Sequence, residues 1–197
     1  GIWYDNSRRM LSCIRVSEHQ ITTPNFHELY ESFLAAYDGK TRNDFGAWYT
    51  PMPLAEYAAK FVDAILPSVL PGENVRDKAI KVVDPCCGTG GFLVAAMQRL
   101  FRLAGNDISK REQVRKLQIC GCELRSDIFT YACSSMRFRG DGKSNIYNGD
   151  CFHYAKSIEE NHKPTVAFLN PPYDVGTTGQ MKFVEHALNV LDKKANR

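Results

Sequence analysis

Short apolar runs alternate with longer helix-like segments between residues 80 and 191, and this alternation constrains the fold more than any other feature. The apolar runs have the length of buried strands, and the longer segments have the length and spacing of helices. Strands are predicted at residues 80–83, 117–122, 145–147 and 166–169, and helices at residues 91–103, 126–137 and 183–191. Such alternation predicts an α/β fold with a mostly parallel sheet and helices on both of its faces.

Two further helices are predicted upstream of this pattern. Residues 26–37 and residues 54–65 both keep apolar side chains at helical spacing, and Pro53 suits the first turn of the second helix. That second helix is expected to bury one apolar stripe, made of Leu54, Tyr57, Ala58, Phe61, Val62 and Ile65. We therefore divide the chain into an N-terminal arm with helices, residues 1–72, and a sheet-bearing part, residues 73–197.

Composition narrows the class of protein. The 197 residues carry a net charge of +3, which is too small to indicate a nucleic-acid partner by itself. No run of about 18 apolar residues is present, so we expect no membrane-spanning helix. The cysteine count is seven, an odd number, and it favours a reduced, cytoplasmic protein over a disulfide-bonded one.

Four of these cysteines raise a metal-binding alternative. Cys86 and Cys87 follow the first predicted strand, and Cys120 and Cys122 lie at the end of the second, so four sulfurs could approach a zinc ion. Consecutive side chains on a strand point to opposite faces, so adjacent cysteines rarely bind one metal. Free thiols are therefore the favoured interpretation, and we predict no metal site.

A glycine-rich turn joins the first strand of the sheet to its helix. It runs from Asp84 to Phe92 and reads Asp-Pro-Cys-Cys-Gly-Thr-Gly-Gly-Phe. Ligands of open parallel sheets bind beyond the carboxyl ends of the strands, and glycines let the backbone approach them closely. The spacing is neither the dinucleotide fingerprint nor a phosphate-binding P-loop. The carboxylate of Asp84 instead suits a ligand with a positive group, such as an amino-acid ammonium.

Polar residues also follow the other three predicted strands. Glu123 is placed to accept both hydrogen bonds of a ribose diol, or alternatively to cap the helix that follows it. Asp150 could accept from an adenine amino group, although Asn148-Gly149-Asp150 is also ideal turn composition. Asn170 follows the fourth strand, so four strand ends would place polar groups along one rim of the sheet.

The fourth strand ends in Asn170-Pro171-Pro172-Tyr173. The Asn170 side-chain oxygen and the Pro171 carbonyl can both accept hydrogen bonds from a single amino group. The prolines fix the turn, and the ring of Tyr173 offers a face on which a flat base can lie. The alternative interpretation is an ordinary strand followed by a proline turn.

Three motifs in this order resemble those of S-adenosylmethionine-dependent DNA methyltransferases that act on the adenine amino group, most closely the modification subunit of type I restriction–modification systems. The turn at 84–92 is similar to the family's cofactor loop, and 170–173 to its catalytic tetrapeptide. Residues 45–51, Phe-Gly-Ala-Trp-Tyr-Thr-Pro, resemble the upstream segment that contacts the methionine end of the cofactor.

The resemblance implies a Rossmann-like methyltransferase fold and assigns roles to individual residues. The catalytic residues would be Asn170, Pro171, Pro172 and Tyr173. The residues that bind S-adenosylmethionine would be Tyr49, Thr50, Asp84, Cys86, Gly88, Gly90, Glu123, Asp150 and Asn170. The target adenine would be flipped out of the DNA duplex and stacked on Tyr173.

The resemblance also implies partners, namely DNA and the specificity and restriction subunits of the same system. Members of the family continue through three more strands, so we expect an incomplete sheet of about four strands in part of a longer protein. Strand 166–169 would then lie at an edge that is open to self-association. Two alternatives remain: a methyltransferase acting on RNA or protein glutamine, and a catalytically silent fragment or assembly module.

Overall fold

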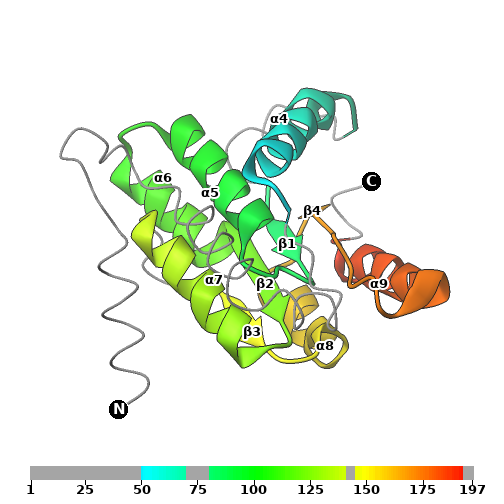
Figure 1. Ribbon diagram of the computed structural model, residues 1–197. Helices are drawn as coiled ribbons and strands as arrows, with labels where there is room; N and C mark the ends of the chain where they lie inside the picture. The colour runs from blue at the N-terminus through cyan, green and yellow to red at the C-terminus, as the bar shows by residue number, and fades with distance from the viewer. Residues whose placement is uncertain (1–49, 70–79, 141–144, 193–197) are drawn as a thin grey trace, which may run out of the picture.

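The computed structural model describes residues 50–69, 80–140 and 145–192 (Figure 1). The helices are α4 (Met52–Val69), α5 (Gly91–Ala104), α6 (Ile108–Gln113), the π-helix η1 (Val114–Gln118), α7 (Ser126–Phe138), α8 (Cys151–Asn161) and α9 (Gly176–Val190). The strands are β1 (Val82–Asp84), β2 (Ile119–Glu123), β3 (Ile146–Asn148) and β4 (Val166–Ala167).

The four described strands form one parallel sheet in the order β3-β2-β1-β4. Val83 pairs with Cys120 of β2 on one side and with Ala167 of β4 on the other, so β1 lies in the interior of the sheet. The predictions of an α/β fold, of about four parallel strands and of the last strand at an edge are therefore confirmed.

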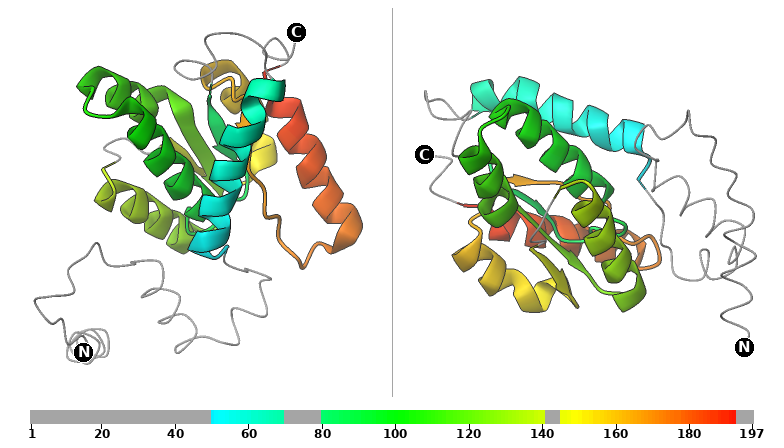
Figure 2. Two further views of the ribbon diagram at one scale, coloured as in Figure 1. Left: turned by 90° about the horizontal axis from the view of Figure 1, so that it is seen from above. Right: turned by 90° about the vertical axis from the view of Figure 1, so that its left-hand side faces the viewer.

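Helices cover both faces of this sheet, because successive strand residues point to opposite sides. Val82 and Ile119 point into the larger core, which α4, α5 and α7 complete on one face. Val83 and Cys120 point into a smaller core beneath α8 and α9 on the other face. The right-hand view of Figure 2 shows these two helical layers on either side of the strands.

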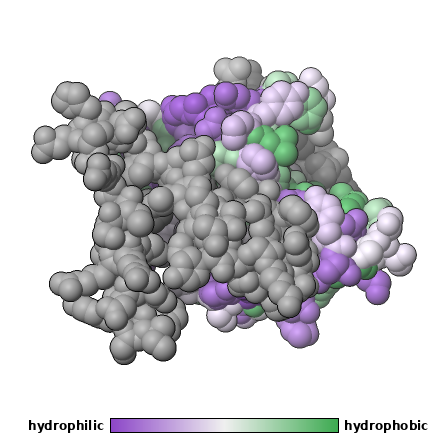
Figure 3. Space-filling view, viewed as in Figure 1, coloured by the Kyte–Doolittle hydropathy of each residue, from purple (hydrophilic) through white to green (hydrophobic). Residues whose placement is uncertain are grey.

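Helix α4 packs differently from the sequence prediction. Its small residues Ala55 and Ala59 are buried against α5, together with Met52 and Leu66. Asp63 and Arg99 form an ion pair between the two helices. Of the predicted stripe, Ala58 and Val62 are partly buried, whereas Leu54, Tyr57, Phe61 and Ile65 are exposed. Small residues allow two helices to pack closely, so the alanines of α4 lie on its buried face. The larger apolar side chains contribute to the hydrophobic surface over α4 in Figure 3.

Several further elements differ from prediction. The helix α8 and the α6–η1 segment were not predicted, and α4 extends two residues beyond Pro67. The predicted helix at residues 26–37 lies outside the described residues, as does the predicted domain boundary at residue 72. Within the described ranges, no helix combines the length and hydropathy that crossing a bilayer requires.

Candidate functional site

Parallel pairing places the carboxyl ends of all four strands at the same edge of the sheet (Figure 1). Asp84 ends β1 and Glu123 ends β2, while Asp150 and Asn170 follow β3 and β4 within a few residues. The structure therefore brings the four predicted strand-end residues to one rim.

The glycine-rich turn is held to the sheet by its own backbone. The Cys87 N–H donates to the Cys122 carbonyl at 2.9 Å, and the Gly90 N–H donates to the Cys87 carbonyl at 2.7 Å. Gly88 and Gly90 have φ angles of 53° and 85°, a left-handed conformation that side chains other than glycine adopt at a cost. A Cβ built on Gly88 meets no atom within 4 Å, so space is open beside this part of the turn.

Glu123 ties this turn to the second strand. Its Oε2 accepts from the Gly88 N–H at 3.0 Å, and its Oε1 accepts from the Arg125 N–H at 2.9 Å. Arg125 precedes the first residue of α7, so the carboxylate orders both the loop and the start of a helix. Each carboxylate oxygen can accept more than one hydrogen bond, which leaves capacity for a ligand diol.

Asp84 is the most buried carboxyl group of the rim, with 1% of its surface exposed. Its Oδ1 accepts from the Cys86 N–H at 3.1 Å. Burial raises the pKa of Asp84 to about 7, and the nearby Glu123 charge adds to the shift. Burial also raises the pKa of Glu123 above its ordinary value. A buried and a partly buried carboxyl group that repel each other favour a cationic ligand, which would stabilise their charged forms.

Asp150 has a structural role in the described chain. It is the N-cap of α8, and its Oδ1 accepts from the Phe152 N–H at 3.0 Å. The turn that contains it is also tied to β2, because the Gly149 N–H donates to the Glu123 carbonyl at 2.9 Å. The carboxylate thus lies at the predicted rim, although a helix cap already uses one of its oxygens.

The tetrapeptide lies beside the glycine-rich turn. The rings of Phe168 and Phe92 stack with centroids 5.1 Å apart, and the Phe168 N–H donates to the Val83 carbonyl at 2.9 Å. These contacts hold the segment before Asn170 against β1 and the first turn of α5. Pro171 and Pro172 are half-buried, whereas the ring of Tyr173 is 55% exposed.

Thr50 comes from the upstream segment and meets both motifs. Its Oγ1 accepts from the Asn170 Nδ2 at 3.0 Å. A Cβ on Gly91 would lie 3.3 Å from the Thr50 carbonyl oxygen, so the two backbones are in close contact. Thr50 was predicted to bind cofactor, and its contact with Asn170 was not foreseen. Tyr49, predicted alongside it, lies outside the described residues.

The cysteines of this region are free thiols. Burial raises the pKa of Cys87 and Cys122 and raises that of Cys120 to about 12, so these groups stay protonated near neutral pH. In the described parts of the chain, no three His, Cys, Asp or Glu side chains are arranged to hold a metal ion. The zinc alternative therefore gains no support. Cys86, predicted to contact the cofactor, is half-buried in the turn.

One residue of the site was overlooked in the sequence. Gly121 lies in β2, and a Cβ there would come within 2.7 Å of Leu93 Cδ1, 3.2 Å of the Asp84 carbonyl and 3.3 Å of Cys87 Cβ. The glycine lets the turn and α5 pack directly on the sheet. A glycine inside a predicted strand is the signal that could have indicated this close approach.

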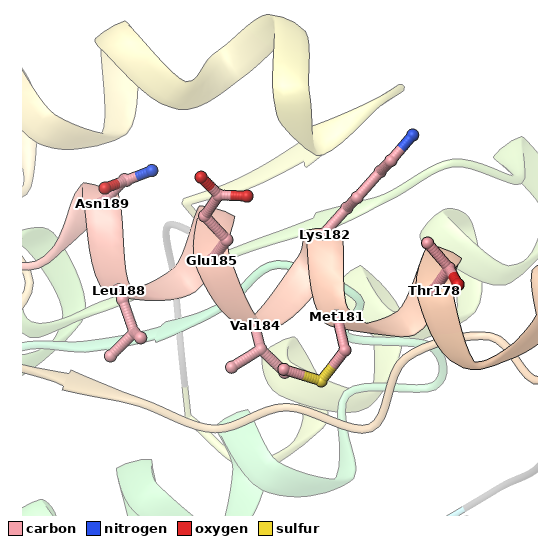
Figure 4. A pocket seen from close by; sticks show the side chains of 7 residues that line it. All are labelled: Thr178, Met181, Lys182, Val184, Glu185, Leu188 and Asn189. Atoms are coloured by element: carbon pink, nitrogen blue, oxygen red, sulfur yellow. The ribbon is translucent and has the colours of Figure 1, made fainter.

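A hollow of about 470 Å³ lies elsewhere, along one side of α9. Figure 4 shows Met181, Val184 and Leu188 on one side of this helix, with Lys182 and Glu185 turned away from them. None of the strand-end residues lines this hollow. The geometry of the rim, rather than this surface, thus defines the candidate site.

Comparison with known proteins identifies the family. The N-6 DNA methylase model matches residues 22–194, and the chain belongs to this family. It is 31% identical over 161 residues to the type II restriction enzyme and methyltransferase RM.BcgI of Heyndrickxia coagulans, a match that covers 79% of this chain and 23% of that protein. It is 29% identical to the type I restriction enzyme MjaIX methylase subunit of Methanocaldococcus jannaschii, over 80% of this chain and 24% of that subunit. The chain therefore spans about a quarter of the length of these relatives.

Solved structures agree on the fold. A modification subunit of a putative type I restriction enzyme from Vibrio vulnificus matches 82% of this chain and 34% of its own, with a TM-score of 0.57 and 23% identity. The EcoKI M protein matches 83% of this chain and 35% of its own, with a TM-score of 0.56 and 19% identity. The predicted methyltransferase fold is confirmed.

Proposed function

We propose that this chain is the cofactor-binding and catalytic part of an adenine-specific DNA methyltransferase in a restriction–modification system. The observation that carries the proposal is the convergence of Asp84, Glu123 and Asn170 at one rim of a parallel sheet, in a chain of the N-6 DNA methylase family. The reaction would place a methyl group on the exocyclic amine of adenine.

S-adenosylmethionine fits the chemistry of the rim. Asp84 would face its ammonium group, because a buried carboxyl with a raised pKa gains most from a nearby cation. Glu123 would accept from the ribose hydroxyls, and Asp150 would accept from the adenine amino group of the cofactor. The open space beside Gly88 would let the ligand approach the backbone, with Cys86, Gly90 and Thr50 around it. When bound, the cofactor would supply a methyl group attached to a positively charged sulfur. The carbon of that methyl group is the electrophile.

The tetrapeptide would hold the amine that receives this methyl group. Asn170 Oδ1 and the Pro171 carbonyl would accept its two hydrogens, which draws electron density onto the nitrogen and orients its lone pair. Holding both reactants in contact supplies most of the rate enhancement. Pro172 would fix the turn, and Tyr173, with its exposed ring, would stack on an adenine flipped out of the duplex.

DNA would be the principal partner. The specificity and restriction subunits of the same system would be further partners, and the edge of β4, which pairs with no further strand among the described residues, would be a site for self-association. A solved relative with 23% identity and a TM-score of 0.53 is described as a DrdV–DNA complex. A DNA substrate and the free thiols of Cys86, Cys87, Cys120 and Cys122 are consistent with a cytoplasmic location.

Tritium transfer tests the proposal most simply. The full-length protein that carries this chain would be incubated with labelled S-adenosylmethionine and unmethylated genomic DNA, and the nucleosides would then be separated. We expect the label in N6-methyladenine. Label in RNA or in protein glutamine instead would overturn the DNA assignment, and cofactor binding without any transfer would favour a silent assembly module.

A further inference from the structure

Thr50 lies where three segments distant in the sequence meet. It directly precedes Pro51, whose carbonyl accepts the first backbone hydrogen bonds of α4, from Leu54 at 2.9 Å and Ala55 at 3.0 Å. Helix α4 is in turn packed on α5. The Thr50 backbone also lies against Gly91, the first residue of α5, so both helices hold it in place.

The Thr50 hydroxyl is bonded to the side chain that the proposed reaction depends on most. Asn170 Nδ2 donates to Thr50 Oγ1 at 3.0 Å across 120 residues of sequence. The Tyr173 hydroxyl donates to the other end of the same amide, Oδ1, at 3.3 Å. The two contacts agree on the orientation of the amide, with its nitrogen toward Thr50 and its oxygen toward the tetrapeptide.

Orientation matters because the two ends of an amide have opposite hydrogen-bonding character. With Oδ1 toward the target, Asn170 accepts a hydrogen of the amine and leaves its lone pair available. With the amide reversed, Nδ2 would donate toward that nitrogen and compete for the lone pair. With the amide reversed, Thr50 could keep this contact only by donating its hydroxyl hydrogen to Oδ1, which would leave no hydrogen to donate to a bound cofactor.

We propose that Thr50 is a positioning residue for Asn170, and that its hydroxyl fixes the amide with Oδ1 facing the adenine amine. The inference rests on the proposed function and deepens it. Because a hydroxyl both accepts and donates, the same group can still donate to a bound cofactor. In a variant without this hydroxyl, turnover should fall mainly because Asn170 loses its hydrogen-bond acceptor, and less because cofactor affinity falls.

Two substitutions at Thr50 separate positioning from binding in the full-length protein. Thr50→Val keeps the branched shape and removes the hydroxyl, while Thr50→Ser keeps the hydroxyl. We expect Thr50→Val to lower kcat about tenfold to a hundredfold, as misplaced reacting groups do. Cofactor Kd should change less than kcat does, and Thr50→Ser should restore most of kcat. Thr130→Val makes the same chemical change on the exposed face of α7 and should leave kcat unaltered.

The outcomes discriminate between this inference and the proposed function. Wild-type protein that transfers no methyl group refutes the function and the inference together. An active wild type combined with a Thr50→Val variant of normal kcat overturns the inference alone. An increase in cofactor Kd with unchanged kcat would assign Thr50 to cofactor binding and also overturn it. An equal loss in Thr50→Ser and Thr50→Val would show that the hydroxyl is not the active feature.

Discussion

Glu123 accepts a hydrogen bond from the backbone N–H of Gly88, with Oε2 lying 3.0 Å from the nitrogen. This contact joins the end of β2 to the middle of the glycine-rich turn. The sequence predicted a ligand role for the carboxylate and, alternatively, a helix-capping role. In the structure the carboxylate accepts hydrogen bonds from the turn and from the start of α7, so it orders both.

Substitution of Glu123 should therefore affect both the turn and ligand affinity. Glu123→Gln keeps the size but replaces one acceptor oxygen with a donor, so it cannot accept at both ends. Hydrogen bonds to charged groups are worth about 1.5–3 kcal/mol, so we expect cofactor binding to weaken about tenfold to a hundredfold. Isothermal titration measures this change, and hydrogen exchange at Gly88 should quicken in the free protein.

A matched control for that variant is Glu159→Gln, on the exposed surface of α8. It should bind cofactor like the wild type. If the two variants behave alike, Glu123 has no special role at the rim.

The raised pKa of Asp84 predicts a pH dependence of stability. Burial favours the protonated form of Asp84. The folded state therefore keeps this proton up to a higher pH than the unfolded chain, in which the pKa is near 3.8. The contribution of this group is fully present below pH 3.8 and is lost as the pH rises through about 7. Asp84→Asn imitates the protonated form, so the variant should melt higher than the wild type at pH 8 and similarly at pH 4. Thermal melts at both pH values, without cofactor, measure this difference.

The same variant should lose affinity for the cofactor, since the neutral amide offers no charge to an ammonium. Greater stability at pH 8 together with weaker binding would mark a site whose charge serves a ligand rather than the fold. If the Asp84→Asn variant melts at a lower temperature than the wild type at pH 8, burial does not destabilise the charged form of Asp84 as we expect.

Substitution of Gly121 should cause a packing defect. In Gly121→Ala the new methyl would lie 2.7 Å from Leu93 Cδ1, in a position where Leu93 is fully buried. Overpacking of this kind destabilises a core by about 1–3 kcal/mol, which urea unfolding can measure. Leu93→Ala would remove the clashing atom, so the double variant should be less destabilised than the sum of the single variants. Simple additivity would show that the contact is relieved elsewhere.

Two substitutions at Tyr173 separate the effect of its ring stacking from the effect of its hydrogen bond. Tyr173→Phe keeps the ring and removes the hydroxyl that donates to Asn170, so it should retain methyl transfer. Tyr173→Ala removes the stacking face, which is worth about 1–3 kcal/mol per base, and should weaken productive DNA binding accordingly. Kinetics of both variants on one DNA substrate give the comparison. Equal activity of Tyr173→Ala and Tyr173→Phe would argue against a stacked base.

Most of the sheet could be predicted from the sequence because its strands are short apolar runs that end in polar residues. The parallel direction of the strands followed from the intervening helices, and the rim followed from the positions of Asp84, Glu123 and Asn170. Helix α8 escaped prediction because only Cys151 and Ile158 of its residues are buried, too few to form a recognisable apolar stripe.

The misassigned face of α4 has a different cause. Hydrophobicity favoured Leu54, Tyr57 and Phe61 as the buried residues, but Ala55 and Ala59 allow the helix to pack more closely on α5. The contact of Thr50 with Asn170 could not be foreseen either, since it joins residues 120 positions apart whose proximity depends on the whole sheet.

Asn170→Ala offers the most direct measurement of the central claim, that the rim holds a cofactor and an adenine amine side by side. The full-length variant, the wild type and the control Asn189→Ala, which is exposed on α9, would be compared for tritium transfer to adenine in DNA and for cofactor Kd. We expect Asn170→Ala to lose transfer while its cofactor Kd stays close to that of the wild type, and Asn189→Ala to retain both. Normal transfer by Asn170→Ala would contradict the account.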